Sequence, residues 1–394
     1  MSGTVIVAGA RTPIGRLLGG LKSFSAADLG GIAIKGALEK AGVTGEQVDY
    51  LIMGQVILAG AGQNPARAAG LAGGLPASVP SITVNKVCLS GLNAIATADQ
   101  MIRAGEADII VAGGMESMTN APHLLPKSRE GFKYGDTALV DSMAYDALFD
   151  QATQQAMGGL TEACNAATDK FTREEQDAFA AASHQKAAEA WKNGVFDDEV
   201  VPVSIPQRKG DPVVVSSDEG VRGDTTAESL GGLRPAFAKD GTITAGTSSQ
   251  ISDGASAVLL MDSDLAASLG LKPRARIVSH CLVGSDPYFH LDGPVDATQR
   301  ILDRTGMSIS DFDLFEVNEA FASVVLSWAG EHKVDMDKVN VNGGAIAIGH
   351  PVGSTGTRLI TTALHELERR DASTALISMC AGGAMATGTV IERL

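Results

Sequence analysis

The pattern of hydrophobic and polar positions predicts short apolar strands that alternate with helices ending at glycine. Residues 37–50 read ALEKAGVTGEQVDY, which is typical of a helix, a glycine stop, a short turn and an acidic residue that opens an apolar strand. Residues 301–314, ILDRTGMSISDFDL, repeat this order. The alternation indicates an α/β protein.

Two further pairs of segments recur in the same order. An apolar strand ending in Ala-Gly-Gly occurs in residues 107–118 and again in residues 374–388. A glycine-rich loop and a helix precede these strands, in residues 88–105 and 349–368. Because several elements recur in one order, the sequence predicts two copies of one α/β unit. The alternative is the general likeness that any two α/β units share.

The repeat divides the chain into two halves and an insertion. We assign residues 1–118 and 249–272 to the first half and residues 273–394 to the second. Residues 119–248 are rich in turn signals, so we expect an inserted loop domain there. Within it, a helix is expected over residues 172–193, because Thr172 and Glu175 have the spacing of a capping box.

Composition narrows the possible partners. The formal net charge of −15 gives a surface that repels nucleic acid and anionic membranes, so we predict neither as a partner. An anionic substrate would therefore require a local basic patch. The four cysteines, Cys88, Cys164, Cys281 and Cys380, include no CxxC pair.

Targeting and metal-binding signals are also missing from the sequence. The apolar run at the N-terminus is too short for a signal peptide, and no stretch is long enough to span a membrane. The histidines have no spacing that suits a metal ion. We therefore expect a cytoplasmic protein with free thiols, no metal and no cofactor.

Cys88 is the first candidate for chemistry. In SITVNKVCLSGLNAIATADQMI an apolar extended segment runs into Cys88, and a helix follows at once. The positive end of that helix favours a thiolate. The unpaired N–H groups of the first turn are suited to holding an oxyanion. A lone cysteine is more often buried and inert, so this assignment depends on the other motifs.

His350 lies in the second motif, NVNGGAIAIGHPVGSTGTR, residues 340–358. This glycine-rich segment lacks the GxGxxG spacing of a dinucleotide loop. Its glycines allow a ligand to approach the backbone, and a histidine here is able to take a proton from a thiol. A structural loop histidine is the alternative.

Two more motifs end predicted strands. Cys380 precedes a glycine turn in MCAGGAMATG, residues 379–388, at the edge where α/β active sites form. Asn318 and Glu319 interrupt an apolar strand in FEVNEAFA, residues 315–322. Taken alone, that polar pair is more typical of a helix cap.

Taken together, these motifs resemble the thiolase family over essentially the whole chain. The segments that carry the resemblance are CLSGLNAIA, GGMESM, NEAFA, NGGAIAIGHPVGSTGTR and CAGGAMATG, in this order. The resemblance implies a five-layered αβαβα sandwich of two duplicated halves with an inserted loop domain. It implies acyl-CoA substrates and either CoA-dependent cleavage of 3-ketoacyl-CoA or Claisen condensation of acetyl-CoA.

The resemblance also implies roles for individual residues. Cys88 would carry the acyl group, His350 would activate it, and Cys380 would move the proton of the substrate α-carbon. One oxyanion hole would use His350 and a water held by Asn318, and the other the N–H groups of Cys88 and Gly382. The positions that would contact CoA or the acyl group are Met157, Arg222, Ser249 and Phe321.

The resemblance further implies a homotetramer built from dimers, because residues 121–136 resemble the family's tetramerisation loop; a dimer is the alternative. Two departures are present: Ala156 stands where many members have histidine, and Ala384 where many have glycine. A methyl group at position 384 would be tolerated if φ is negative there. A ketoacyl synthase, which lacks the second cysteine, and a non-catalytic acyl-CoA carrier are the rival functions. The sequence leaves the direction of flux and the preferred acyl chain open.

Overall fold

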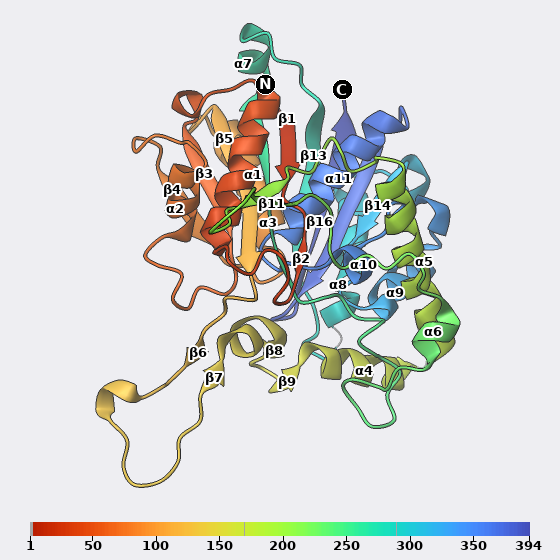
Figure 1. The fold of residues 1–394 in the computed structure, drawn as a ribbon. Helices are drawn as coiled ribbons and strands as arrows, with labels where there is room; N and C mark the ends of the chain where they lie inside the picture. The colour runs from red at the N-terminus through yellow and green to blue at the C-terminus, as the bar shows by residue number, and fades with distance from the viewer. Residues whose placement is uncertain (1–2, 169, 289) are drawn as a thin grey trace.

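The computed structural model describes residues 3–168, 170–288 and 290–394 (Figure 1). Its main sheet divides into two halves. The first half contains, in spatial order, β4 (Ser81–Val84), β3 (Tyr50–Gly54), β5 (Ile109–Ser117), β12 (Ser252–Asp262) and β1 (Thr4–Arg11). The second half continues with β13 (Ala275–Gly284), β16 (Met385–Arg393), β15 (Thr374–Ala381) and β14 (Leu314–Val317). The short β2 (Gly15–Arg16) pairs with β12.

The two halves share one strand arrangement, as the repeat predicted. β3 is parallel to β4 and β5, and β14 is parallel to β15, whereas the other pairings are antiparallel. A single parallel bridge between Phe315 and Val339 stands in the second half where β4 stands in the first. Only Val5 and Ile6 of β1 pair with β13, so the halves meet along a short seam.

Helices form three layers around these strands. α1 (Ala26–Ala41) and α2 (Pro65–Ala72) cover the outer face of the first half, and α8 (Gly293–Thr305) and α9 (Ala322–His332) that of the second. α3 (Ser90–Arg103) and α11 (Thr355–Arg369) lie between the halves in one shared apolar core. The predicted five-layered αβαβα sandwich is therefore confirmed.

Glycine allows the two central helices to touch. A Cβ added at Gly356 would lie 2.6 Å from the backbone nitrogen of Leu92, and one at Gly91 would lie 2.8 Å from Thr357 Oγ1. The predicted glycine stops are also present, since Gly42 after α1 and Gly306 after α8 both have positive φ.

The inserted residues fold mostly as loops with short elements. They contain β6 (His123–Leu124), β7 (Val140–Asp141), β8 (Phe149–Asp150), β9 (Gln155–Ala156), α4 (Met157–Thr168), α5 (Arg173–Lys192), β10 (Val203–Ile205), β11 (Val213–Val215) and α6 (Ala227–Gly231). The helix predicted over residues 172–193 is confirmed, with the Thr172–Glu175 capping box in place. The exact domain boundaries stay predictions. α7 (Ser263–Ser268) follows β12, and α10 (Ala345–Ile348) precedes α11.

A buried ion pair network fastens the insertion to the first half. Arg11 at the end of β1 binds Glu199 through Nε at 2.6 Å and Asp218 through Nη1 at 2.7 Å. All three side chains are buried. Because an unpaired buried charge is costly, this pairing holds the loops over the sheet in one position.

Candidate active site

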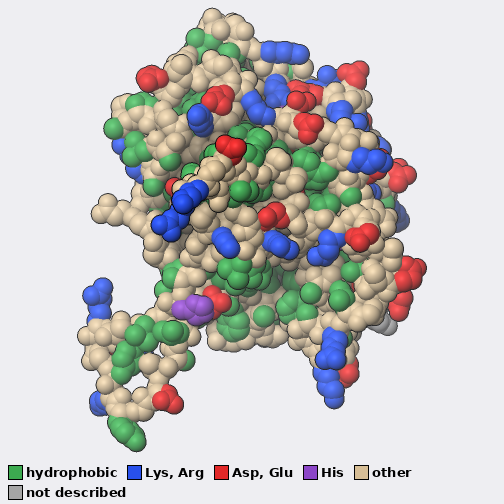
Figure 2. Space-filling model, viewed as in Figure 1, with side chains coloured by type: hydrophobic (Ala, Val, Ile, Leu, Met, Phe, Trp, Pro, Cys, Tyr) green, Lys and Arg blue, Asp and Glu red, His purple; other side chains and the backbone are tan. Residues whose placement is uncertain are grey.

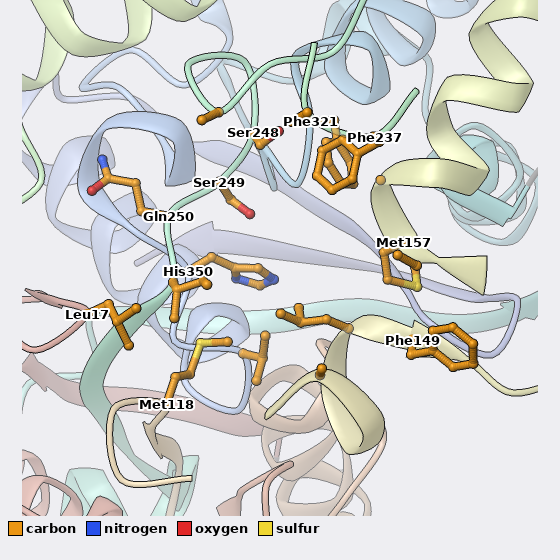
Figure 3. A pocket seen from close by; sticks show the side chains of 18 of the residues that line it. Leu17, Met118, Phe149, Met157, Phe237, Ser248, Ser249, Gln250, Phe321 and His350 are labelled. Carbon is orange, nitrogen blue, oxygen red and sulfur yellow. The ribbon is translucent and has the colours of Figure 1, made fainter. Parts of the chain in front are cut away.

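A cavity of about 580 Å³ lies where the insertion meets the two halves. Figure 3 shows His350 pointing into its centre, with Met157 and Phe149 on one side and Leu17 and Gln250 on the other. Most of its wall is apolar. A cavity of this size, with a few polar groups converging on it, is a typical small-molecule site.

Cys88 occupies the tight turn between β4 and α3. Ser90 closes this turn, because its Oγ accepts from Lys86 N at 2.8 Å and donates to Val87 O at 2.6 Å. Val87 has a φ of +49°, a strained conformation for a β-branched residue. Cys88 packs against the apolar cluster that includes Met118 and Val352, two residues of the cavity wall. The turn thus places Cys88 beside residues that line the cavity, and its role as the nucleophile stays a prediction.

The ionisation of Cys88 differs from the prediction. Burial raises the pKa of this thiol to about 11, although the N–H groups of Gly382 and of Cys88 itself act in the opposite direction. The prediction that the helix end favours a thiolate was wrong, because loss of hydration outweighs the helix end here. Proton removal from Cys88 therefore needs a base.

His350 is the candidate for this base, and hydrogen bonds hold it in place. Its backbone N–H donates to Gln250 O at 3.2 Å and to Ser252 Oγ at 3.1 Å. Its Nδ1 lies 2.6 Å from Thr355 Oγ1, while Nε2 is buried and has no hydrogen-bond partner among the described residues. Burial first, and then the positive charge of Arg358, lower the pKa of His350 to about 3. The ring is thus neutral, with one nitrogen available to a substrate or a thiol.

Cys380 lies near the end of β15, close to Cys88. It is buried and packs with Met157 and Phe321, two residues of the cavity wall. Burial raises the pKa of the Cys380 thiol, and the neighbouring Cys88 raises it further. The Gly382 N–H, two residues on, is directed at the Cys88 thiol, consistent with its predicted place in an oxyanion hole.

Asn318 reaches the same edge of the sheet through strand register. Val317 pairs with Ser378 in the parallel β14–β15 ladder, so Asn318 follows its strand one step beyond, as Met379 and Cys380 follow theirs. Asn318 is 1% exposed. Neither its Oδ1 nor its Nδ2 has a hydrogen-bond partner within the described part of the chain. A buried amide left unpaired costs stability, which points to a functional role for Asn318 rather than the helix-cap alternative.

Of the four residues predicted to contact CoA or the acyl group, three line the cavity and one does not. Met157, Ser249 and Phe321 line the cavity, as expected. Arg222 is not among its lining residues: it is exposed, and its Nη2 lies 3.1 Å from His184 Nε2. Its segment lies beside the cavity wall, because Gln250 of the wall donates to the carbonyl of Gly220, two residues before Arg222, at 3.2 Å.

Several lining residues carried no signal in the sequence. Arg16 is an exposed basic side chain on the wall, contributed by β2, and no motif marked it. The apolar wall is completed by residues far apart in the chain, namely Leu17, Met118, Leu148, Phe149, Phe237 and Val352.

The two departures from the family pattern lie at this site. Ala156 lines the cavity beside Met157, and its small side chain leaves space open there. Ala384 has a φ of +57°, so the condition of a negative φ is not met. The residue follows Gly383, whose φ is +75°, in the turn between β15 and β16, which forces a left-handed conformation on both.

The described residues offer neither a candidate metal site nor a helix that could cross a membrane. Within residues 3–168, 170–288 and 290–394, no group of three His, Cys, Asp or Glu side chains could hold a metal ion. In the same ranges no helix combines the length and the apolar character that a membrane crossing requires.

Comparison with known proteins agrees with the fold. The models of the thiolase N-terminal and C-terminal domains match residues 4–264 and 271–393. The chain is 58% identical, over 99% of its length, to all of a probable acetyl-CoA acetyltransferase from Mycolicibacterium smegmatis. It is 51% identical, with both chains fully covered, to an acetyl-CoA acetyltransferase from Cupriavidus necator.

A solved structure extends this likeness to three dimensions. The acetyl-CoA acetyltransferase of Bacillus anthracis matches with a TM-score of 0.97 and 39% identity, covering 100% of this chain and 99% of that one. The chain therefore belongs to the thiolase family.

Proposed function

We propose that the chain is an acyltransferase that catalyses the acetyl-CoA acetyltransferase reaction through an acyl-Cys88 intermediate. The observation that carries this is the cavity that His350 lines, since its Nε2 has no hydrogen-bond partner among the described residues. Cys88 and Cys380 belong to apolar clusters that include the cavity-wall residues Met118 and Phe321. The names of the full-length relatives support the same reaction.

In the first half-reaction the Cys88 thiol transfers its proton to His350 Nε2, and the sulfur attacks the thioester carbon. The C–S bond to CoA breaks, CoA leaves as a thiol after taking that proton from His350, and an acyl-Cys88 thioester remains. The N–H groups of Cys88 and Gly382 would hold the oxyanion. Each such donor contributes on the order of 10²–10³ in rate.

In the second half-reaction Cys380 first gives up its own thiol proton and, as a thiolate, removes the α-proton of acetyl-CoA. The carbanion attacks the acyl group, and Cys88 leaves as a thiolate that takes up the proton Cys380 released. His350 and a water held by Asn318 would stabilise the enolate. Cleavage of a 3-ketoacyl-CoA runs through the same steps in reverse. Arg16 on the cavity wall, and Arg222 in the segment beside it, supply basic charge for the anionic CoA.

The test of this function is the CoA-dependent loss of acetoacetyl-CoA absorbance, with Cys88→Ala as the control. A ketoacyl synthase would not require Cys380, and an acyl-CoA carrier would bind acetoacetyl-CoA without consuming it. Binding without turnover in the native protein would reject the proposal.

The four cysteines are unpaired, which suits a reducing cytoplasm.

We also propose a homotetramer built from dimers. Residues 121–141 extend away from the body and expose four large apolar side chains, Leu125, Phe132, Tyr134 and Leu139 (Figures 1 and 2). β4, an edge strand with Ile82 exposed, offers a separate surface for dimerisation. Exposed apolar patches of this kind mark contact sites.

Light scattering is expected to give the mass of four chains of 40.5 kDa each. A variant with both Phe132→Ser and Tyr134→Ser is expected to form dimers, because the two substitutions remove apolar contacts only from residues 121–141. A monomeric native protein at micromolar concentration would reject both assemblies.

Alkylation of Cys88 by iodoacetamide has an expected pH profile. Since the Cys88 pKa is about 11, the rate constant should rise about tenfold per unit between pH 8 and 10. The rise should extend down to pH 7 without a plateau, because a His350 pKa of about 3 leaves the Cys88–His350 ion pair less populated than the ordinary thiolate. Peptide mapping should place the label on Cys88, since the other three cysteines are buried. An inflection near pH 7 would contradict the raised pKa.

A further inference from the structure

The hydroxyl of Thr355 is the partner of the His350 ring. Thr355 is the first residue of α11, is fully buried, and lies 2.6 Å from His350 Nδ1 through Oγ1. A catalytic histidine works best when a third group orients it, so that the free nitrogen faces the reacting atoms. We propose that Thr355 is a positioning residue that fixes the orientation of His350 and supports both of its neutral tautomers. This inference rests on the proposed role of His350 as the base.

Counting protons shows why a hydroxyl suits this position. Thr355 Oγ1 also lies 3.0 Å from the carbonyl oxygen of Pro351, which can only accept. When the hydroxyl donates to Pro351 O, it must accept from Nδ1–H, and Nε2 is left bare. A bare Nε2 is the form that takes the Cys88 proton.

The second tautomer requires only a rotation of the hydroxyl. If the hydroxyl donates to Nδ1 instead, the proton lies on Nε2, which then donates to a thioester oxygen. Pro351 O stays satisfied in both states, because it also accepts from Ser354 N at 2.9 Å and Thr355 N at 3.0 Å. The two states match the two tasks that the proposed reaction assigns to His350.

The surroundings keep His350 neutral between these tasks. The ring lies at the N-terminal end of α11, whose positive end disfavours an imidazolium. Arg358, one turn further along α11, acts in the same direction. A carboxylate at position 355 would stabilise the imidazolium and hold a proton on Nδ1, whereas threonine does neither.

The test compares Thr355→Val, which keeps the shape of the side chain, with Thr355→Ser, which keeps the hydroxyl. Thr355→Val should lower kcat for acetoacetyl-CoA cleavage 10–100-fold, the range seen when the partner of a functional histidine is removed, with little change in KM. Thr355→Ser should stay within about threefold of the native enzyme. The matched control is Thr361→Val on the same helix, since the buried Thr361 hydroxyl donates only to Thr357 O at 3.0 Å in the described chain.

Alkylation of Cys88 separates positioning from general damage. Thr355→Val should lower kcat while the rate constant of Cys88 alkylation between pH 8 and 10 stays native, because a thiolate formed by loss of its proton to solvent needs no histidine. An equal loss in the alkylation rate constant and in kcat, a Thr355→Ser variant as slow as Thr355→Val, or an equal kcat loss in Thr361→Val would overturn the proposal. A native protein without thiolase activity would reject the proposed function, whereas an active native protein with an unimpaired Thr355→Val variant would reject only the role of Thr355.

Discussion

An enzyme with alanine in place of Cys380 is expected to accept one acetyl group from acetyl-CoA and to stop there. The first half-reaction needs Cys88, His350 and the Cys88–Gly382 oxyanion hole, all of which remain. Condensation also needs a base for the α-proton, and loss of a placed base costs about 10²–10⁴ in rate. Intact mass after incubation with acetyl-CoA, together with the condensation rate, measures both steps.

Cys88→Ala is the matched variant and should fail earlier. It has no sulfur to acylate, so neither acetyl mass nor condensation is expected, although Cys380 is still present. Position supports this division, since Cys88 lies half-buried in a turn at the cavity while Cys380 is fully buried near a strand end. Acetyl mass on Cys88→Ala and none on Cys380→Ala would show that the two roles are reversed.

Most of the fold could be predicted because the duplicated halves share short sequence patterns that mark where helices and strands begin and end. Gly42 and Gly306 stop equivalent helices, and Thr172 with Glu175 caps α5, so these short-range signals survive in the structure. The single Phe315–Val339 bridge could not be predicted, since it depends on how far a neighbouring segment follows β14. The network of Arg11 with Glu199 joins residues almost 200 positions apart, and no local pattern marks it.

The site was predictable where a motif carries its chemistry. Cys88, His350 and Cys380 each lie in a glycine-flanked segment, and the structure brings these segments together. The sequence does not show how far Cys88 is buried, so the predicted direction of its pKa shift was wrong. Burial raises the pKa by more than the N–H groups at the helix end lower it. The sequence also could not show that the turn forces Ala384 to a positive φ, or that Arg222 lies beside His184. Such properties depend on packing between distant segments.

Replacing Asn318 with alanine is expected to slow the enzyme and stabilise the fold together. The amide is buried without a hydrogen-bond partner in the structure's described residues, and an unpaired buried polar group costs about 1–3 kcal/mol. Its removal should therefore raise the free energy of unfolding by about 1 kcal/mol, since the small cavity left behind offsets part of the gain. Loss of one oxyanion donor should lower the condensation rate by about 10²–10³.

Asn340 provides the control, because it is an equally buried asparagine on the other side of Val317. Its Oδ1 accepts from Val317 N at 2.9 Å, and its Nδ2 donates to Val317 O at 2.8 Å and to Glu319 at 2.9 Å. Asn340→Ala breaks these bonds and should lower the free energy of unfolding by roughly 2–4 kcal/mol. In Asn318→Ala the free energy of unfolding should thus rise while the condensation rate falls. In Asn340→Ala both should fall. Denaturant unfolding and condensation assays measure the two quantities. If Asn318→Ala lost stability while its condensation rate stayed native, the amide would be a structural group and the second oxyanion hole would have to be built from other atoms.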